Sequence, residues 1–249
     1  MASCFGVAER IWPEMLADND IGHCLIGRTV TQGDRAVAVL VFNQRPNYRP
    51  LQGMRAHRVV SEADIDAAIG PYRRLVVLGD DAELAAVLTR LLRAERLDIE
   101  VAYVPRRRTR ATRIYRLPAG SRAARRAGRG SARRVPLIRD ETGAVIVGRA
   151  AWVPPDDARS IHGEAVVDDT TLFDGDVAGV RIEPTPAMPG LRATVDGRGL
   201  RRLWRSWVTG RAAQLGSTGV AVLRDGVPAP RTARRSAFYR HIEGWLLVR

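Results

Sequence analysis

The sequence predicts an α/β + β fold, in which an N-terminal parallel-sheet βαβ half is followed by an antiparallel β-sandwich domain. Apolar runs alternate with amphipathic stretches up to residue 104, which is the pattern of strands joined by crossover helices. Beyond Val135 the apolar segments become short and turn residues separate them, as in sandwiches and barrels. We therefore expect a leader without clear periodicity at 1–34, an α/β domain at 35–118 and the β-sandwich at 119–249.

The first half has the spacing of a βαβ arrangement. Its expected elements are strands at 35–42, 57–60, 75–78 and 98–104, a helix that starts at Ser61, and a helix at 83–96. Ser61 is a favourable N-cap, and Gly70-Pro71 ends the first helix. The segment 43–56 contains two prolines and a glycine, so we expect an irregular loop there.

A strand that turns directly into a helix lies at the centre of this half. The apolar residues 75–78 run into Gly79-Asp80-Asp81, and the amphipathic helix follows at once. Asp80 is placed to be the N-cap, and Glu83 stands three residues later, as a capping box requires. A helix N-terminus at the carboxyl end of a parallel strand can hold an anion. Asp80 and Asp81 are therefore either helix caps or ligands of phosphate or Mg²⁺.

The second half is expected to consist of short strands. Turn signals such as Thr142-Gly143, Pro189-Gly190 and Asp225-Gly226 separate them. The expected strands lie at 135–139, 144–152, 163–167, 177–182, 191–195, 208–215, 220–224 and 244–248, with a further turn at 173–176 and a closing aromatic tail at 238–245.

Charge and composition exclude several function classes. The formal charge is +13 and all 40 basic residues are arginine, so the sequence holds no P-loop, kinase-type or Schiff-base lysine. No apolar run approaches the ~18 residues that a membrane helix needs, and no basic region precedes an apolar core near the N-terminus. Cys4 and Cys24 make neither a disulfide framework nor a zinc pattern. These observations favour a cytoplasmic protein.

A cluster of arginines follows the last strand of the first half. Twelve arginines and no acidic residue lie between Arg106 and Arg134. Because arginine holds phosphate bidentately, the residues nearest the strand are candidate anion-binding groups. These residues are Arg106, Arg107, Arg108, Arg110 and Arg113. They could instead contact anionic lipid or a nucleic-acid backbone, or form a solvated basic loop. Only Tyr115 interleaves with the cluster, which makes nucleic acid the weakest of these partners.

The order of these landmarks resembles the diacylglycerol kinase-type lipid kinases of bacteria, which are relatives of sphingosine and NAD kinases. That family opens with a strand ending in Asn-Pro-x-(Ser/Ala)-Gly, and here a strand ends in Val41-Phe42-Asn43. Its nucleotide signature, a strand followed by Gly-Gly-Asp-Gly-Thr, corresponds to Leu78-Gly79-Asp80-Asp81-Ala82. Its next strand ends in a proline, which is kept as Pro105.

The second half extends the resemblance, which covers about residues 35 to 249. The segment 135–143 is similar to the family's entry into its β domain, and 172–175 and 189–193 are similar to its middle strands. Arg224-Asp225-Gly226 resembles the family's closing Asp-Gly-Glu segment, in which the aspartate is the proposed base for the lipid hydroxyl.

The resemblance implies ATP-dependent phosphoryl transfer to a lipid hydroxyl, with ATP and Mg²⁺ as cofactors of a nucleotide-binding-like domain at 35–118. It implies that Asp225 is the catalytic base, that Asn43, Gly79, Asp80 and Asp81 contact the nucleotide, and that Asp80 also holds the metal. The residues alone leave a second role open for Asp225, because Asp-Gly is also a common hairpin turn.

The nucleotide signature departs from the family at three of its five positions. Leu78 and Asp81 replace glycines, and Ala82 lacks the hydroxyl group of threonine. A carboxylate about 4 Å from a phosphate charge costs ~4 kcal/mol at an effective dielectric near 20, or roughly three decades of affinity. A bound Mg²⁺ would reverse the sign of that interaction. We therefore expect phosphoryl transfer to be weak or lost.

A non-catalytic binding protein is the alternative function. In that case the arginine-rich loop engages anionic lipid or a phosphorylated partner, and the protein lies in the cytoplasm or at the periphery of a membrane.

Overall fold

The computed structural model describes residues 37–43, 48–156, 158–196 and 206–249. These residues fall within one compact unit, Thr31–Arg249, whereas the predicted leader and both cysteines lie outside them. Among the described strands, six form one sheet and eleven form another. No helix in the described part of the chain is long and apolar enough to cross a membrane.

The first sheet has the strand order β2-β1-β3-β4-β17-β5. Its strands are β1 (Val37–Phe42), β2 (Arg55–Val59), β3 (Arg74–Leu78), β4 (Glu100–Tyr103), β5 (Ala132–Val135) and β17 (Trp245–Val248). The first four pair in parallel, which confirms the predicted βαβ half. The last strand, β17, is parallel to β4 and antiparallel to β5.

Helices cover both faces of this sheet. Since successive side chains of a strand point to opposite faces, each central strand contributes to two cores. The helical elements are η1 (Arg49–Leu51), α1 (Glu62–Ile69), α2 (Asp81–Arg93), α3 (Arg110–Ile114) and α4 (Gly120–Arg129). Leu75 and Val77 of β3 share a core with α1 and α2. Val76 and Leu78 share a second core with η1 and α4.

The second sheet is antiparallel. Its strands are β6 (Ile138–Asp140), β7 (Val145–Ile146), β8 (Ala150–Val153), β9 (Ile161–Val167), β10 (Thr170–Val177), β11 (Val180–Pro184), β12 (Leu191–Val195), β13 (Val208–Gly210), β14 (Ala212–Arg224), β15 (Val227–Pro228) and β16 (Ala233–Arg240). The long strand β14 pairs with β9 through its first residues and with β8 through its last. The two stretches meet at an irregularity between Gly216 and Val220. Trp152 and Phe238 are fully buried in the core of this sheet.

Several expected elements differ from the structure, and the strand expected at 144–152 is two strands, β7 and β8. The strands expected at 208–215 and 220–224 are largely one strand, β14, preceded by the short β13. The prediction of a turn at 173–176 is wrong, because these residues belong to β10 and pair with β9. The chain reverses earlier, next to Asp168, whose φ is 49°. The helix α3 lies in the first part of the arginine cluster, for which we expected no element, whereas α4 includes the one or two helical turns expected at 121–127.

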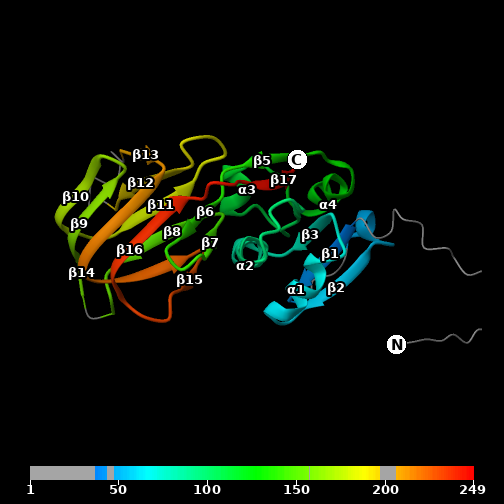
Figure 1. Cartoon of the computed structure of the whole chain (residues 1–249), viewed down its shortest axis with the longest axis horizontal. Coiled ribbons are helices and arrows are strands. Elements are labelled where there is room, and N and C mark those ends of the chain that lie inside the picture. The colour runs from blue at the N-terminus through cyan, green and yellow to red at the C-terminus, as the bar shows by residue number, and fades with distance from the viewer. Residues whose placement is uncertain (1–36, 44–47, 157, 197–205) are drawn as a thin grey trace, which may run out of the picture. The chain divides into compact units, whose positions relative to one another are not determined.

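The C-terminal strand returns to the first sheet. This strand, β17, lies between β4 and β5 in the sheet (Figure 1). In the sequence, all strands of the antiparallel sheet, β6 to β16, come between β5 and β17. Trp245 at its start is buried and packs edge-to-face on Tyr115, with ring centroids 5.6 Å apart. The boundary predicted at residue 118 therefore does not coincide with the change of sheet, since β5 and β17 both pair in the first sheet.

Candidate functional site

The turn between β3 and α2 is closed by its own side chains. Asp80 is the N-cap of α2 and its Oδ1 accepts a hydrogen bond from the Glu83 N–H at 3.2 Å. The Glu83 Oε2 in turn accepts from the Asp80 N–H at 2.6 Å. The predicted capping box is thus present, and it satisfies two of the backbone donors that a helix N-terminus leaves open.

The Glu83 carboxylate lies directly over Gly79. A Cβ at Gly79 would be 2.6 Å from Glu83 Oε2, so only glycine leaves room for that carboxylate. Asn43, which follows β1 and has a φ of 50°, donates a side-chain hydrogen bond to Glu83 Oε1. The structure therefore brings Asn43, Gly79 and Asp80 together, as predicted, but around a glutamate of the same chain.

Asp81 is held by the neighbouring strand and helix. Its Oδ1 accepts from the Tyr103 hydroxyl at 2.8 Å, and its Oδ2 accepts from the Ala111 N–H at 3.1 Å. Burial raises the pKa of Tyr103, and the Asp81 carboxylate raises it further. One oxygen of Asp81 is thus engaged with β4 and the other with α3.

Asp225 occupies a hairpin turn between β14 and β15. Its φ is 48° and that of Gly226 is 89°, which are the two positive values that a type I′ turn requires. Its Oδ1 accepts from the N–H groups of Gly148 and Arg149, both at 2.7 Å, and its Oδ2 from Val147 N–H at 2.9 Å. The carboxylate therefore clamps the segment between β7 and β8.

Burial raises the pKa of Asp225 to about 7. The three backbone N–H groups act in the opposite direction, and the charge of Asp81 adds to the rise. A carboxyl group with this pKa is partly protonated at neutral pH.

Three of the predicted site residues converge on Gly148. A Cβ at this position would lie 2.7 Å from Asp81 Oδ2, 2.8 Å from Asp225 Oδ1 and 3.2 Å from Arg110 Cβ. Gly148 could not be recognised from the sequence, because its role arises only where α2, α3 and the β14–β15 turn approach one another.

Arg110 faces the second sheet. Its guanidinium pairs with Glu183 on β11, whose side chain is fully buried, and Arg192 binds the other oxygen of Glu183 at 2.7 Å. Arg192 also stacks over Trp207 at 4.3 Å. Arg110 thus has an internal carboxylate partner, whereas Arg106, Arg107, Arg108 and Arg113 have none among the residues that the structure describes.

A wide groove lies beside α3 and α4. Its volume is about 710 Å³, and we call it the arginine groove. Its lining consists of Arg108, Thr112, Arg113, Arg116, Leu117, Pro118, Arg122, Arg125 and Arg126. Of the predicted residues only Arg108 and Arg113 line it, while Arg106 and Arg107 are exposed outside the lining. The other four arginines of the lining, Arg116, Arg122, Arg125 and Arg126, were not among the predicted site residues. The spacing of the last three, which places them on one face of a helix, is the signal by which the sequence could have indicated them.

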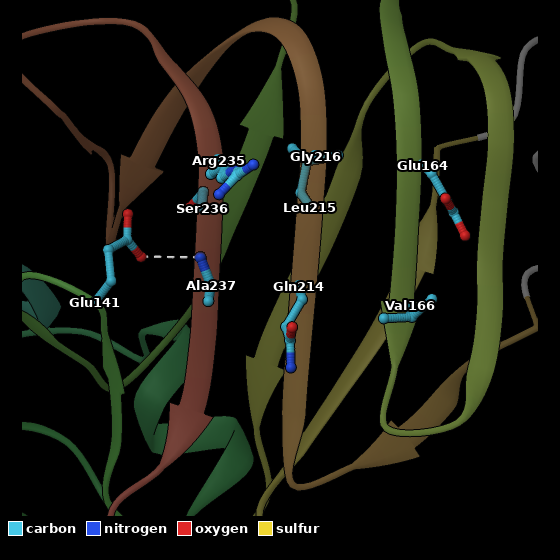
Figure 2. A pocket seen from close by; sticks show the side chains of 9 residues that line it. All are labelled: Glu141, Glu164, Val166, Gln214, Leu215, Gly216, Arg235, Ser236 and Ala237. Atoms are coloured by element: carbon cyan, nitrogen blue, oxygen red, sulfur yellow. Dashed lines mark hydrogen bonds between the residues drawn. The ribbon is translucent and has the colours of Figure 1, made fainter.

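A second groove, of about 530 Å³, lies on the antiparallel sheet (Figure 2). Side chains of β9, β14 and β16 line it, and Glu141 closes one side by accepting from the Ala237 N–H at 2.9 Å. It contains none of the predicted site residues. Within the described residues there is also no group of three or more His, Cys, Asp or Glu side chains that could hold a metal ion.

Solved structures share this fold. A diacylglycerol kinase from Bacillus anthracis matches with a TM-score of 0.65 at 10% identity, over 86% of this chain and 96% of that one. An NAD kinase from Archaeoglobus fulgidus in complex with ATP matches with a TM-score of 0.58 at 12% identity, over 86% and 93%. Yeast NADH kinase complexed with NADH matches with a TM-score of 0.52 at 10% identity, over 87% and 84%. No family model and no curated protein matches the sequence.

The two-domain architecture is therefore that of diacylglycerol kinases and NAD kinases, with a parallel-sheet half and a large antiparallel sheet. This agrees with the fold that the motifs predicted.

Proposed function

We propose that this chain keeps a lipid-kinase fold but is a pseudoenzyme, which has lost ATP-dependent phosphoryl transfer and instead binds anionic ligands through its arginines. One observation carries the proposal: the carboxylates of the chain itself occupy the β3–α2 turn, where the signature glycines of the kinases would approach a nucleotide.

ATP with Mg²⁺ does not fit this turn. The N–H groups of Asp80, Glu83 and Ala111 all donate to carboxylates of the same turn. Phosphoryl transfer relies on such donors and on a surplus of positive charge around the phosphates. A polyphosphate would have to displace the carboxylates and lie beside them, which like-charge repulsion disfavours.

The hydrogen bonds of Asp225 are those of a side chain that holds a neighbouring backbone segment in place. Both of its oxygens accept backbone N–H groups, from Val147, Gly148 and Arg149. This supports the hairpin role over the role of catalytic base.

A working lipid kinase stays the second candidate, because one observation favours it. The pKa of Asp225, raised to about 7, is in the range that suits a general base. In that case Asp225 would take the proton of a lipid hydroxyl, with ATP and Mg²⁺ held near Asp80.

The binding role that we propose rests on uncompensated positive charge. The arginine groove is lined by six exposed arginines and no acidic residue. An anionic lipid headgroup, a phosphorylated partner or a free phosphate compound would each supply the missing charge, and a lipid would place the protein at a membrane periphery.

The test is transfer of labelled γ-phosphate from ATP-Mg²⁺ to a mixed lipid extract by the full chain, alongside Asp80→Ala and Asp225→Ala. We expect no labelled lipid above the level of the two variants. Transfer by the unmodified chain that both substitutions abolish would contradict the loss of catalysis and establish the second candidate.

A further inference from the structure

We propose that the arginine groove is a binding site for a compact oligophosphate, a small molecule with several adjacent phosphate groups. This rests on the proposed anion-binding role and names the chemical class of its ligand.

The helix α4 gathers arginines on one face. Arg122, Arg125 and Arg126 are exposed and line the groove, and Ala123, Ala124 and Ala127 are buried. Residues three and four apart share a face of a helix. The alanines let the helix lie close on η1 and β4, so the arginines are held by a rigid element rather than by a loose loop.

The other arginines of the groove come from the segment around α3. Arg108 precedes the helix, Arg113 is in its last turn and Arg116 follows it. Arg116 has a φ of 55°, a left-handed conformation that is unfavourable for a residue with a side chain. The segment around α3 and the helix α4 form the two arms of the groove, and the chain adopts an unfavourable backbone conformation between them.

The positive charge of the groove is not neutralised within the described part of the chain. None of the six arginines forms an ion pair or a side-chain hydrogen bond there, whereas Arg74, Arg90 and Arg134 elsewhere all pair with carboxylates. Crowded like charges repel one another, so an anion that bridges them is favoured.

The shape of the groove favours an oligophosphate over a membrane. The site is a hollow of about 710 Å³ with Leu117 and Pro118 in its wall. A membrane-docking surface needs apolar side chains that enter the lipid. The large hydrophobic residues that are exposed in the described chain, Val60, Met188, Val227 and Ile242, all lie outside the groove lining.

Nucleic acid fits the groove less well. Single-stranded binding relies on aromatic side chains on which bases stack, and Tyr115, the aromatic residue within the cluster, is buried. With two guanidinium groups on each phosphate, the six arginines match a ligand with about three phosphates.

The experiment is calorimetric titration of the full chain with inorganic tripolyphosphate at fixed ionic strength. The test variant is Arg113→Gln/Arg122→Gln, which removes one arginine from each arm of the groove. The control is Arg129→Gln, an exposed arginine of α4 outside the lining. All three substituted residues are exposed, so the melting temperatures should match that of the unmodified chain.

We expect saturable binding that the double variant weakens at least about tenfold, since one charge-assisted hydrogen-bonded pair is worth that much. The control should bind as the unmodified chain does, and orthophosphate should bind more weakly than tripolyphosphate. Absence of saturable binding would overturn the inference, and so would equal weakening by the control.

A lipid source of the phosphate has its own measurement. Pelleting with anionic vesicles that depends on Arg113 and Arg122, without tripolyphosphate binding, would overturn the oligophosphate and assign the groove to a membrane surface. Phosphoryl transfer to lipid is measured in a separate assay. If the chain does transfer phosphate, the proposed loss of catalysis is wrong, but the tripolyphosphate titration still tests the groove.

Discussion

At Asp225, burial and hydrogen bonding act on one carboxyl group in opposite directions. Three backbone N–H groups favour the charged form, while burial and the neighbouring Asp81 favour the neutral form. Burial dominates, and the pKa rises from 3.8 to about 7. The folded protein therefore keeps a proton on Asp225 at a pH where the unfolded chain has already released it.

We predict that Asp225→Asn reduces the pH dependence of stability. Because the folded pKa is higher than the unfolded one, the contribution of Asp225 to stability is fully present below about pH 4 and decreases as the pH rises to about 7. Asparagine does not titrate, and its side-chain oxygen can still accept from Gly148 and Arg149. Denaturant unfolding at pH 5 and pH 8 should show a smaller loss of stability for the variant than for the unmodified chain. An equal loss in both proteins would contradict the raised pKa, since every other carboxylate is common to the two.

At the scale of the element, α2 depends on its own first turn. Asp80 and Glu83 satisfy each other's backbone donors, and Asn43 binds the same glutamate. The arrangement stabilises the helix end, and it also covers that end with negative charge.

We predict that Asp80→Ala lowers the free energy of unfolding by about 1 kcal/mol, the usual worth of an N-cap. Asp80→Asn should cost much less, because asparagine is an equally good cap. The free energy is measured by denaturant titration of both variants. If the asparagine variant is as unstable as the alanine variant, the charge of Asp80 matters rather than its capping bond.

The capping box could be predicted from the sequence because it is local. Asp80 and Glu83 are three residues apart, so their contact follows from helix geometry alone. The meeting of Asp81 and Asp225 at Gly148 could not be predicted, because it depends on where two separate sheets place their turns. For the same reason the partner of Arg110 was missed, since Glu183 lies on a strand of the other sheet.

The short helix α3 was missed for a different reason. It spans only Arg110–Ile114, and arginine-rich, proline-flanked segments carry little hydrophobic periodicity. Its cap, a Thr109–Thr112 pair, is local but weak as a sequence signal.

At the scale of the whole molecule, the returning strand β17 joins the two sheets. The chain leaves the first sheet after β5, builds the antiparallel sheet and comes back to pair with β4 and β5. Val145 N–H also donates to the Thr89 hydroxyl of α2 at 3.0 Å, which ties the antiparallel sheet to a helix of the first. The first sheet is therefore complete only when the whole chain has folded.

We predict that Trp245→Ala destabilises the whole unit in one cooperative transition. Loss of a buried aromatic side chain costs about 3–5 kcal/mol, and Trp245 is 1% exposed. Circular dichroism and tryptophan fluorescence, to which the buried Trp152 of the other sheet contributes, should give the same lowered midpoint. Two separate transitions would contradict the coupling. Trp207→Ala, at a half-buried tryptophan, is the control and should cost less.

Direct titration with nucleotide tests the central claim, that the chain's own carboxylates close the β3–α2 turn. Because the arginine groove can also attract a triphosphate, the protein to use is the full chain carrying Arg113→Gln/Arg122→Gln. We predict that Asp80→Ala changes nothing in the binding of ATP-Mg²⁺ to this protein up to about 1 mM, the upper end of ordinary Michaelis constants, because whatever binding remains belongs to the groove. Saturable binding in this protein that Asp80→Ala abolishes would show that the turn still holds a nucleotide, and would contradict the claim.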